Sequence, residues 1–265
     1  MKQQLLPQIV RLTPSSYADW MWCPRMFYVG ALLHVPASDT GVSPDQGLLV
    51  HDVLEKVHVS GSCHDVAHVD AVLRACQADT EQMRGYVTRH ERRCPQQFDY
   101  QEHEIDRVRF HREPAPMFLA SARIDAIWIH DGILDARDYK TGRRPENTLA
   151  DDPRARVQAW VLGDDAQRNG LQLRLRYEYL QPEADEDPDP WEPDADDLAM
   201  VGEELRAAVA SMWDEESGDA EPARTRWRGV NDPLVCRTCR YRSICRDSAS
   251  PGEPVWPVLS ADVES

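Results

Sequence analysis

Two aspartates, Asp125 and Asp138, lie in alternating apolar stretches on either side of the dipeptide Asp131-Gly132 (RIDAIWIHDGILDARDYKTG). An Asp-Gly pair between two alternating runs is typical of a two-residue β-hairpin turn. This turn fixes the pairing of the strands and predicts that Asp125 lies directly opposite Asp138. Facing side chains have Cβ atoms about 4.5–5.5 Å apart, and like charges there repel. Two such carboxylates need a cation, and the hard ions Mg²⁺ and Mn²⁺ prefer oxygen ligands.

Lys140 follows Asp138 by two residues, so both side chains leave the same face of the predicted strand. The chain contains three lysines and 27 arginines, which indicates that a primary amine is required at this position. An amine beside metal-binding carboxylates can orient an attacking water and can share protons, which arginine cannot do. The alternative is a surface hairpin with an ordinary Asp–Lys pair.

The sequence resembles the RecB-type branch of the PD-(D/E)XK nuclease superfamily over roughly residues 14–246. The resemblance rests on four motifs in order, which are GxxxH (Gly47 to His51), RID (Asp125), DYKTG (Asp138 and Lys140) and a helix with RVQ (Gln158). It differs from the usual pattern at Ala122, where glycine is common, and at Leu162, where a tyrosine is expected.

The resemblance implies a role for each residue of these motifs. His51, Asp125, Asp138 and the backbone carbonyl of Tyr139 would bind a catalytic Mg²⁺ or Mn²⁺. Lys140 would assist the attacking water, with Asp125 and Asp138 as its catalytic partners, and Gln158 would lie beside the site.

Seven cysteines are an odd number for a disulfide framework, which favours metal binding. Cys236, Cys239 and Cys245 have the spacing C-x2-C-x5-C, and Cys23 in WMWCPR is the candidate fourth ligand. Four thiolates suit Zn²⁺ or an iron–sulfur cluster, and the spacing alone does not separate the two. One early and three late cysteines resemble the iron–sulfur members of the family, such as the AddB nuclease subunit, the CRISPR-associated adaptation exonucleases and the nuclease domain of a eukaryotic replication helicase-nuclease. The resemblance implies a [4Fe–4S] cluster rather than Zn²⁺.

The other three cysteines, at positions 63, 76 and 94, show no ligand spacing, and we interpret them as ordinary thiols.

The formal net charge of −16 argues against a nucleic-acid partner, but it is unevenly distributed. Residues 181–223 carry −15, whereas residues 224–246 contain seven arginines and one acidic residue. We interpret the acidic segment as a solvated loop and helix, the alternative being a mimic that guards a basic groove. The basic segment predicts phosphate contacts and stacking on single strands, the alternative being a solvated tail. The candidate DNA-binding residues are Arg143, Arg226, Trp227, Arg228, Arg240 and Tyr241.

Periodicity predicts the elements that position these residues. Helices are expected at residues 14–33 with a break at Pro24, 44–59, 66–93, 153–168 and 194–217, and strands at 101–111, 117–130, 133–141 and 171–180. This pattern predicts an α/β core with a helical insertion in front. The resemblance implies that the core is PD-(D/E)XK restriction-endonuclease-like, with helices flanking a mixed sheet and with a cysteine-clipped C-terminal tail.

We expect one RecB-like nuclease domain over residues 1–246. Its parts are a helical part (44–95), a catalytic sheet core (101–180), an acidic loop and helix (181–223) and an iron–sulfur tail (224–246) joined to Cys23, followed by a flexible tail (247–265).

The resemblance implies a metal-dependent deoxyribonuclease, an exonuclease on single-stranded ends or flaps, acting in DNA repair, recombination or CRISPR spacer acquisition. Its partners would be DNA with single-stranded ends or overhangs, and CRISPR integrase proteins or a helicase. One alternative is a non-catalytic, metal-clipped DNA-binding or adaptor subunit. Another is an enzyme with a redox-active cluster, but the sequence contains no flavin motif. Without a signal peptide or a run of about 18 apolar residues, we expect a cytoplasmic protein with no membrane partner.

Overall fold

The computed structural model describes residues 9–36, 44–95, 98–109, 117–142, 147–181, 189–217, 227, 229–230 and 232–245. The predicted flexible tail, Arg143, Arg226, Arg228 and part of the acidic segment lie outside these residues.

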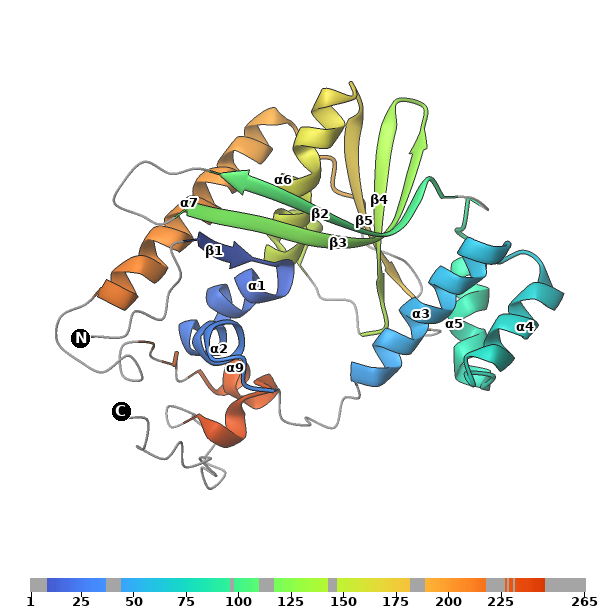
Figure 1. The fold of residues 1–265 in the computed structure, drawn as a ribbon, viewed down its shortest axis with the longest axis horizontal. Coiled ribbons are helices and arrows are strands. Elements are labelled where there is room, and N and C mark those ends of the chain that lie inside the picture. The colour runs from blue at the N-terminus through green and yellow to red at the C-terminus, as the bar shows by residue number, and fades with distance from the viewer. Residues whose placement is uncertain are drawn as a thin grey trace, which may run out of the picture.

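A five-stranded mixed sheet forms the centre of the fold (Figure 1). Its strands are β1 (Ile9–Leu12), β2 (Tyr100–Arg109), β3 (Met117–His130), β4 (Ile133–Lys140) and β5 (Gln172–Tyr179). Strand β2 runs antiparallel along one edge of β3. On the other edge of β3, β1 pairs with its first residues and β4 pairs with its last residues. β5 is parallel to β4. The mixed sheet confirms the predicted fold class.

Strand β1 was not predicted from the sequence. It has only four residues (IVRL), too few to show alternation, and its partner on β3 is residues 117–120, far along the chain.

The hairpin register agrees with the prediction. Asp131 and Gly132 both have positive φ angles (47° and 77°), as a two-residue type I′ turn requires. The β3–β4 pairing runs from His130 and Ile133 to Ala126 and Arg137. Beyond this point β4 continues against β5. The two strands therefore diverge at Asp125 and Asp138, which lie at the opening of this fork.

Gly132→Ala should strain the turn that sets this register, because a side chain in the left-handed region costs about 1–2 kcal/mol. We expect the melting temperature to fall by roughly 2–6 °C, measured by circular dichroism. Gly142→Ala is the matched control, since Gly142 has no such φ angle and a Cβ added there would meet none of the described residues within 4 Å. An equal fall in both variants would show that the turn conformation is not the cause.

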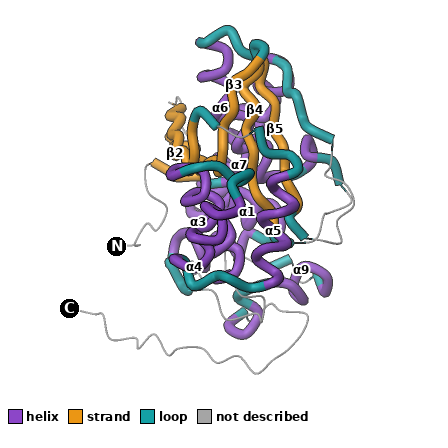
Figure 2. Tube along the Cα trace, turned by 90° about the vertical axis from the view of Figure 1, so that its right-hand side faces the viewer, coloured by secondary structure: helices purple, strands orange, loops and turns teal. Residues whose placement is uncertain are grey.

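Helices cover the sheet and form with it, among the described residues, two large hydrophobic cores and a small third one around Leu149 and Tyr177 (Figures 1 and 2). The larger core joins the sheet to α1 (Pro14–Trp22), α2 (Pro24–Phe27), α6 (Pro153–Arg168) and α7 (Ala195–Ser217). A π-helical turn (Tyr28–Leu32) follows α2. A 3₁₀ turn (Leu149–Asp151) precedes α6, and α9 (Pro233–Thr238) with a 3₁₀ turn (Arg242–Ile244) lies in the tail.

The second core belongs to a helical lobe of α3 (Pro44–Ser60), α4 (Val66–Ala75) and α5 (Glu81–Glu91) at one end of the sheet (Figure 1). The helix predicted over 66–93 is two helices, because Thr80 caps a new start and its side chain accepts a hydrogen bond from the Met83 N–H. None of the helices in the described residues has the length and apolar character needed to cross a membrane.

Candidate active site and cysteine pocket

Asp125 is a buried carboxylate at the fork between β3 and β4, with 8% of its surface exposed. The backbone N–H of Tyr139 donates to its Oδ2 at 2.5 Å, and Nδ1 of His51 lies 2.9 Å from its Oδ1. Burial, and next to it the negative charge of Asp138, raise the pKa of Asp125 to about 7 against the opposing effects of His51 and the Tyr139 amide. Two buried negative charges therefore repel each other here, and a cation between them would remove the repulsion.

Helix α3 brings His51 to this fork. Its Nε2 lies 3.1 Å from the carbonyl oxygen of Tyr139, while its Nδ1 contacts Asp125. A neutral imidazole has only one N–H, so one of these contacts sets two lone pairs against each other unless a proton or a metal cation intervenes. One turn earlier, a Cβ at Gly47 would lie 3.4 Å from Oγ1 of Thr141, so the glycine of GxxxH keeps the helix close to the end of β4.

Asp138 and Lys140 form an ion pair on β4, with Nζ 2.7 Å from Oδ2. Nε2 of Gln158, a buried side chain of α6, donates to the same oxygen at 2.7 Å. Burial acts to raise the pKa of Asp138, but the charge and hydrogen bond of Lys140, together with Gln158, hold it below its usual value. The site thus contains one carboxylate that is readily protonated and one that stays charged.

Tyr177 of β5 completes the surroundings of Lys140 and Gln158, and the sequence did not single it out. Its hydroxyl donates to Oε1 of Gln158 at 3.2 Å, and its ring centroid lies 4.3 Å from Nζ of Lys140. Position 162, where the resemblance predicts a tyrosine, is occupied by Leu162, which is buried in the core. The feature that identifies Tyr177 as a site residue is the register between β4 and β5, in which Tyr177 pairs with Asp138.

The structure therefore brings together all of the predicted residues at the fork, namely His51, Asp125, Asp138, Tyr139, Lys140 and Gln158. Two carboxylates, a carbonyl oxygen and an imidazole are ligands that can hold Mg²⁺ or Mn²⁺.

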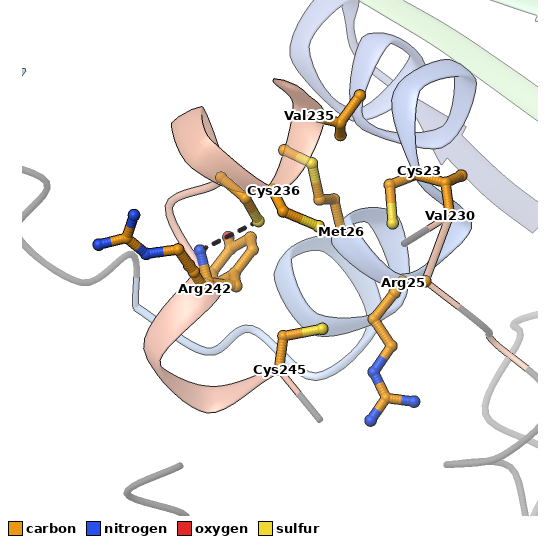
Figure 3. Close-up of a pocket in the computed structure, with 11 residues that line it drawn as sticks. Cys23, Arg25, Met26, Val230, Val235, Cys236, Arg242 and Cys245 are labelled. Carbon is orange, nitrogen blue, oxygen red and sulfur yellow. Dashed lines mark hydrogen bonds between the residues drawn. The ribbon is translucent and has the colours of Figure 1, made fainter. Parts of the chain in front are cut away.

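The four predicted cluster cysteines line one pocket, which contains about 350 Å³ of empty space, part of it open to solvent. Cys23 caps the beginning of α2, Cys236 lies in α9, and Cys239 and Cys245 follow it. Figure 3 shows the sulfur atoms of Cys23, Cys236 and Cys245 directed toward a shared space. Burial, and to a smaller degree the neighbouring cysteines, raise the pKa of the Cys239 thiol to about 11 against the opposing hydrogen bond from the Tyr241 amide. A metal centre would supply the positive charge that such thiolates need.

Two residues predicted to stack on DNA bases are buried instead, so this expectation is wrong. Trp227 is fully buried and stacks on Tyr28, with a centroid distance of 5.8 Å. Tyr241 is 5% exposed and packs so tightly that a Cβ at Gly30 would lie 2.5 Å from its hydroxyl oxygen. The physical reason is that the tail docks on the N-terminal helices and uses its aromatic rings to fill that interface.

Arg240 also takes part in this docking. It forms an ion pair with the buried Asp19 of α1, and its guanidinium lies 5.2 Å from the Tyr241 ring centroid. Its charge is therefore at least partly neutralised within the chain.

Comparisons with known proteins identify the family. The family model described as the PD-(D/E)XK nuclease superfamily matches residues 11–246. No curated protein matches the chain. Among solved structures, the chain is similar to one titled "Crystal structure of SSO0001", with 13% identity and a TM-score of 0.41, covering 91% of this chain and 87% of the other. The family match spans most of the sequence, including both aspartates, Lys140 and the four pocket cysteines. The chain therefore belongs to the PD-(D/E)XK nuclease superfamily.

Proposed function

We propose that this protein is a metal-dependent deoxyribonuclease of the RecB type that degrades single-stranded ends or overhangs. The observation that carries the proposal is the arrangement at the fork, where Nζ of Lys140 lies 2.7 Å from Asp138 and Asp125 is buried beside them. A non-catalytic DNA-binding or adaptor subunit is the alternative, but it would not need an amine paired with a carboxylate that Gln158 also holds.

His51, Asp125, Asp138 and the carbonyl of Tyr139 would hold the divalent cation. When bound, it would act as a Lewis acid toward a phosphoryl oxygen and lower the pKa of water. Lys140 would orient the attacking water and offset the negative charge that develops on the phosphate. Gln158 and Tyr177 would keep Asp138 in place, through the hydrogen bonds at 2.7 and 3.2 Å.

We also propose that Cys23, Cys236, Cys239 and Cys245 hold a [4Fe–4S] cluster, with Zn²⁺ as the alternative. The pocket these cysteines share supports a metal centre, and their one-early, three-late spacing supports iron. The cluster would join the tail to α2 and close one domain over residues 1–246.

CRISPR spacer acquisition with integrase proteins, and repair with a helicase, are the two settings that fit such an enzyme. Arg143, Arg226, Arg228 and Arg240 remain the predicted phosphate contacts.

Asp138→Asn should abolish cleavage, because it removes a negative charge from the metal ligands and half of the pair with Lys140. The assay is degradation of 5′- and 3′-end-labelled single-stranded DNA with Mg²⁺ or Mn²⁺ and an EDTA control. We expect activity to fall at least about 10²-fold. Asp52→Asn is the matched control, since this acid lies next to His51 in sequence but pairs with Lys56 on the surface.

An active Asp138→Asn variant would contradict the assignment of this carboxylate. A wild-type protein that binds single-stranded DNA but never cleaves it under any of these conditions would support the non-catalytic alternative.

A further inference from the structure

A second group of metal-ligand side chains lies in the helical lobe, away from the four pocket cysteines. His58 comes from the last turn of α3, Cys63 from the loop after it, His90 from α5 and Cys94 from the segment that follows. One ligand atom from each lies within 4.8 Å of all the others. The spacing of the cysteines alone indicates ordinary thiols. A metal site becomes visible only when the histidines are counted with them, His58 five residues before Cys63 and His90 four residues before Cys94.

The four side chains contact one another. Nε2 of His58 lies 2.8 Å from Nε2 of His90 and 3.5 Å from Sγ of Cys94. The thiols of Cys63 and Cys94 are hydrogen-bonded to each other. His90 is fully buried and Cys63 is 2% exposed. Tetrahedral Zn²⁺ with two sulfur and two nitrogen ligands would hold these atoms about 3.3–3.8 Å apart, so small side-chain shifts would suffice.

Glu178 of β5 orients His90 as a metal ligand needs. Its Oε1 lies 2.8 Å from Nδ1 of His90, so in a neutral, metal-binding imidazole the proton would sit on Nδ1 and the lone pair of Nε2 would point into the group. Nη1 of Arg137 lies 3.7 Å from the other carboxylate oxygen. A carboxylate that orients a histidine in this way is the usual partner of a metal-binding imidazole.

The chemistry and the location both indicate a structural ion. Two thiolates and two imidazoles in a tetrahedral arrangement select Zn²⁺, and four protein ligands leave no open position for substrate. The core of the helical lobe includes Ala126 and Tyr139 of the sheet, and a metal bound between α3 and α5 would add to this packing.

We propose that His58, Cys63, His90 and Cys94 bind one structural Zn²⁺ that fastens α3 to α5 within the helical lobe. The site also lies near the candidate active site. His58 is two helical turns after His51 on α3, and the His90 ring centroid lies 5.0 Å from that of Tyr139. A zinc ion here would therefore hold in place the helix that supplies His51 and the His90 ring that packs against Tyr139. It does not rest on the proposed nuclease function.

The test is the metal content of the full-length protein, purified without chelators and measured by mass spectrometry of zinc and iron. Wild type should contain zinc, and the double variant Cys63→Ser, Cys94→Ser should contain about one zinc ion per chain less, with its iron unchanged. Cys76→Ser is the matched control, because this thiol lies in the same lobe, 3.7 Å from Nζ of Lys56 and outside the group. Cys236→Ser should lose metal from the other pocket and keep this zinc.

Alkylation of the wild-type protein keeps the proposal testable if the double variant does not fold. The thiols of Cys63 and Cys94 should react with N-ethylmaleimide only after a chelator removes zinc, whereas Cys76 should react in both conditions. Wild type without zinc, equal zinc in the double variant, or a disulfide between Cys63 and Cys94 would overturn the proposal.

Discussion

Lys140→Ala should abolish cleavage of single-stranded DNA while leaving the fold intact. The ammonium group is held 2.7 Å from Asp138, and alanine would remove both the charge and the group that orients the attacking water. End-labelled DNA with Mg²⁺ or Mn²⁺ is the assay, and circular dichroism checks the fold. Lys56→Ala is the matched control, because Lys56 forms an exposed ion pair with Asp52 that contributes little.

Lys140→Arg separates the role of the charge from that of the amine. The guanidinium is a wide planar fork that does not release its proton at working pH, and Nζ of Lys140 already lies 4.3 Å from the Tyr177 ring centroid. We expect activity to fall about 10²-fold or more, the usual scale of a lost acid–base contribution. An arginine variant as fast as wild type would leave the enzyme assignment standing and would show that charge alone is needed at this position.

Cys23→Ala should give a colourless protein of low solubility and stability. Cys23 and the late cysteines line one pocket, so a metal there would close a chain segment of more than 200 residues. Losing a link of this length costs about 5 kcal/mol or slightly more in the chain-entropy model, which predicts a melting temperature lower by roughly 10 °C or more. The buried contacts of Trp227 with α1 and α2 would also loosen.

Absorption near 400 nm, iron content and the melting temperature are the measurements for this variant. Cys76→Ala should stay as brown and as stable as wild type. If the Cys23→Ala protein kept its colour and stability, Cys23 would not be a ligand of the metal centre. Zinc in place of iron in the wild-type pocket would favour the alternative metal.

The sequence alone determined the features that depend on neighbouring residues. Asp131-Gly132 fixed the hairpin register, because a type I′ turn requires positive φ angles that these two residues tolerate. The predicted helix over residues 153–168 agrees with α6 (Pro153–Arg168), where Asp152 caps the start and Pro153 begins the helix. The Asp138–Lys140 pair was predictable for the same reason, since a period of two places both on one strand face.

Only the tertiary structure decided which distant residues meet. Tyr177 contacts Gln158 and Lys140 because the β4–β5 ladder is parallel, and a parallel partner cannot be read from a turn. His58 and His90 join Cys63 and Cys94 because α3 and α5 pack against each other, although neither pair alone completes a metal site.

Trp227 is a residue whose burial the sequence did not predict. In the sequence it lies between arginines, which favours an exposed ring on a DNA-binding surface. In the fold it lies buried among Trp20, Phe27 and Tyr28, because burying a large aromatic ring against other rings is more favourable than leaving it in water. Sequence position reports the charge around a residue, whereas its burial depends on which surface the chain docks against.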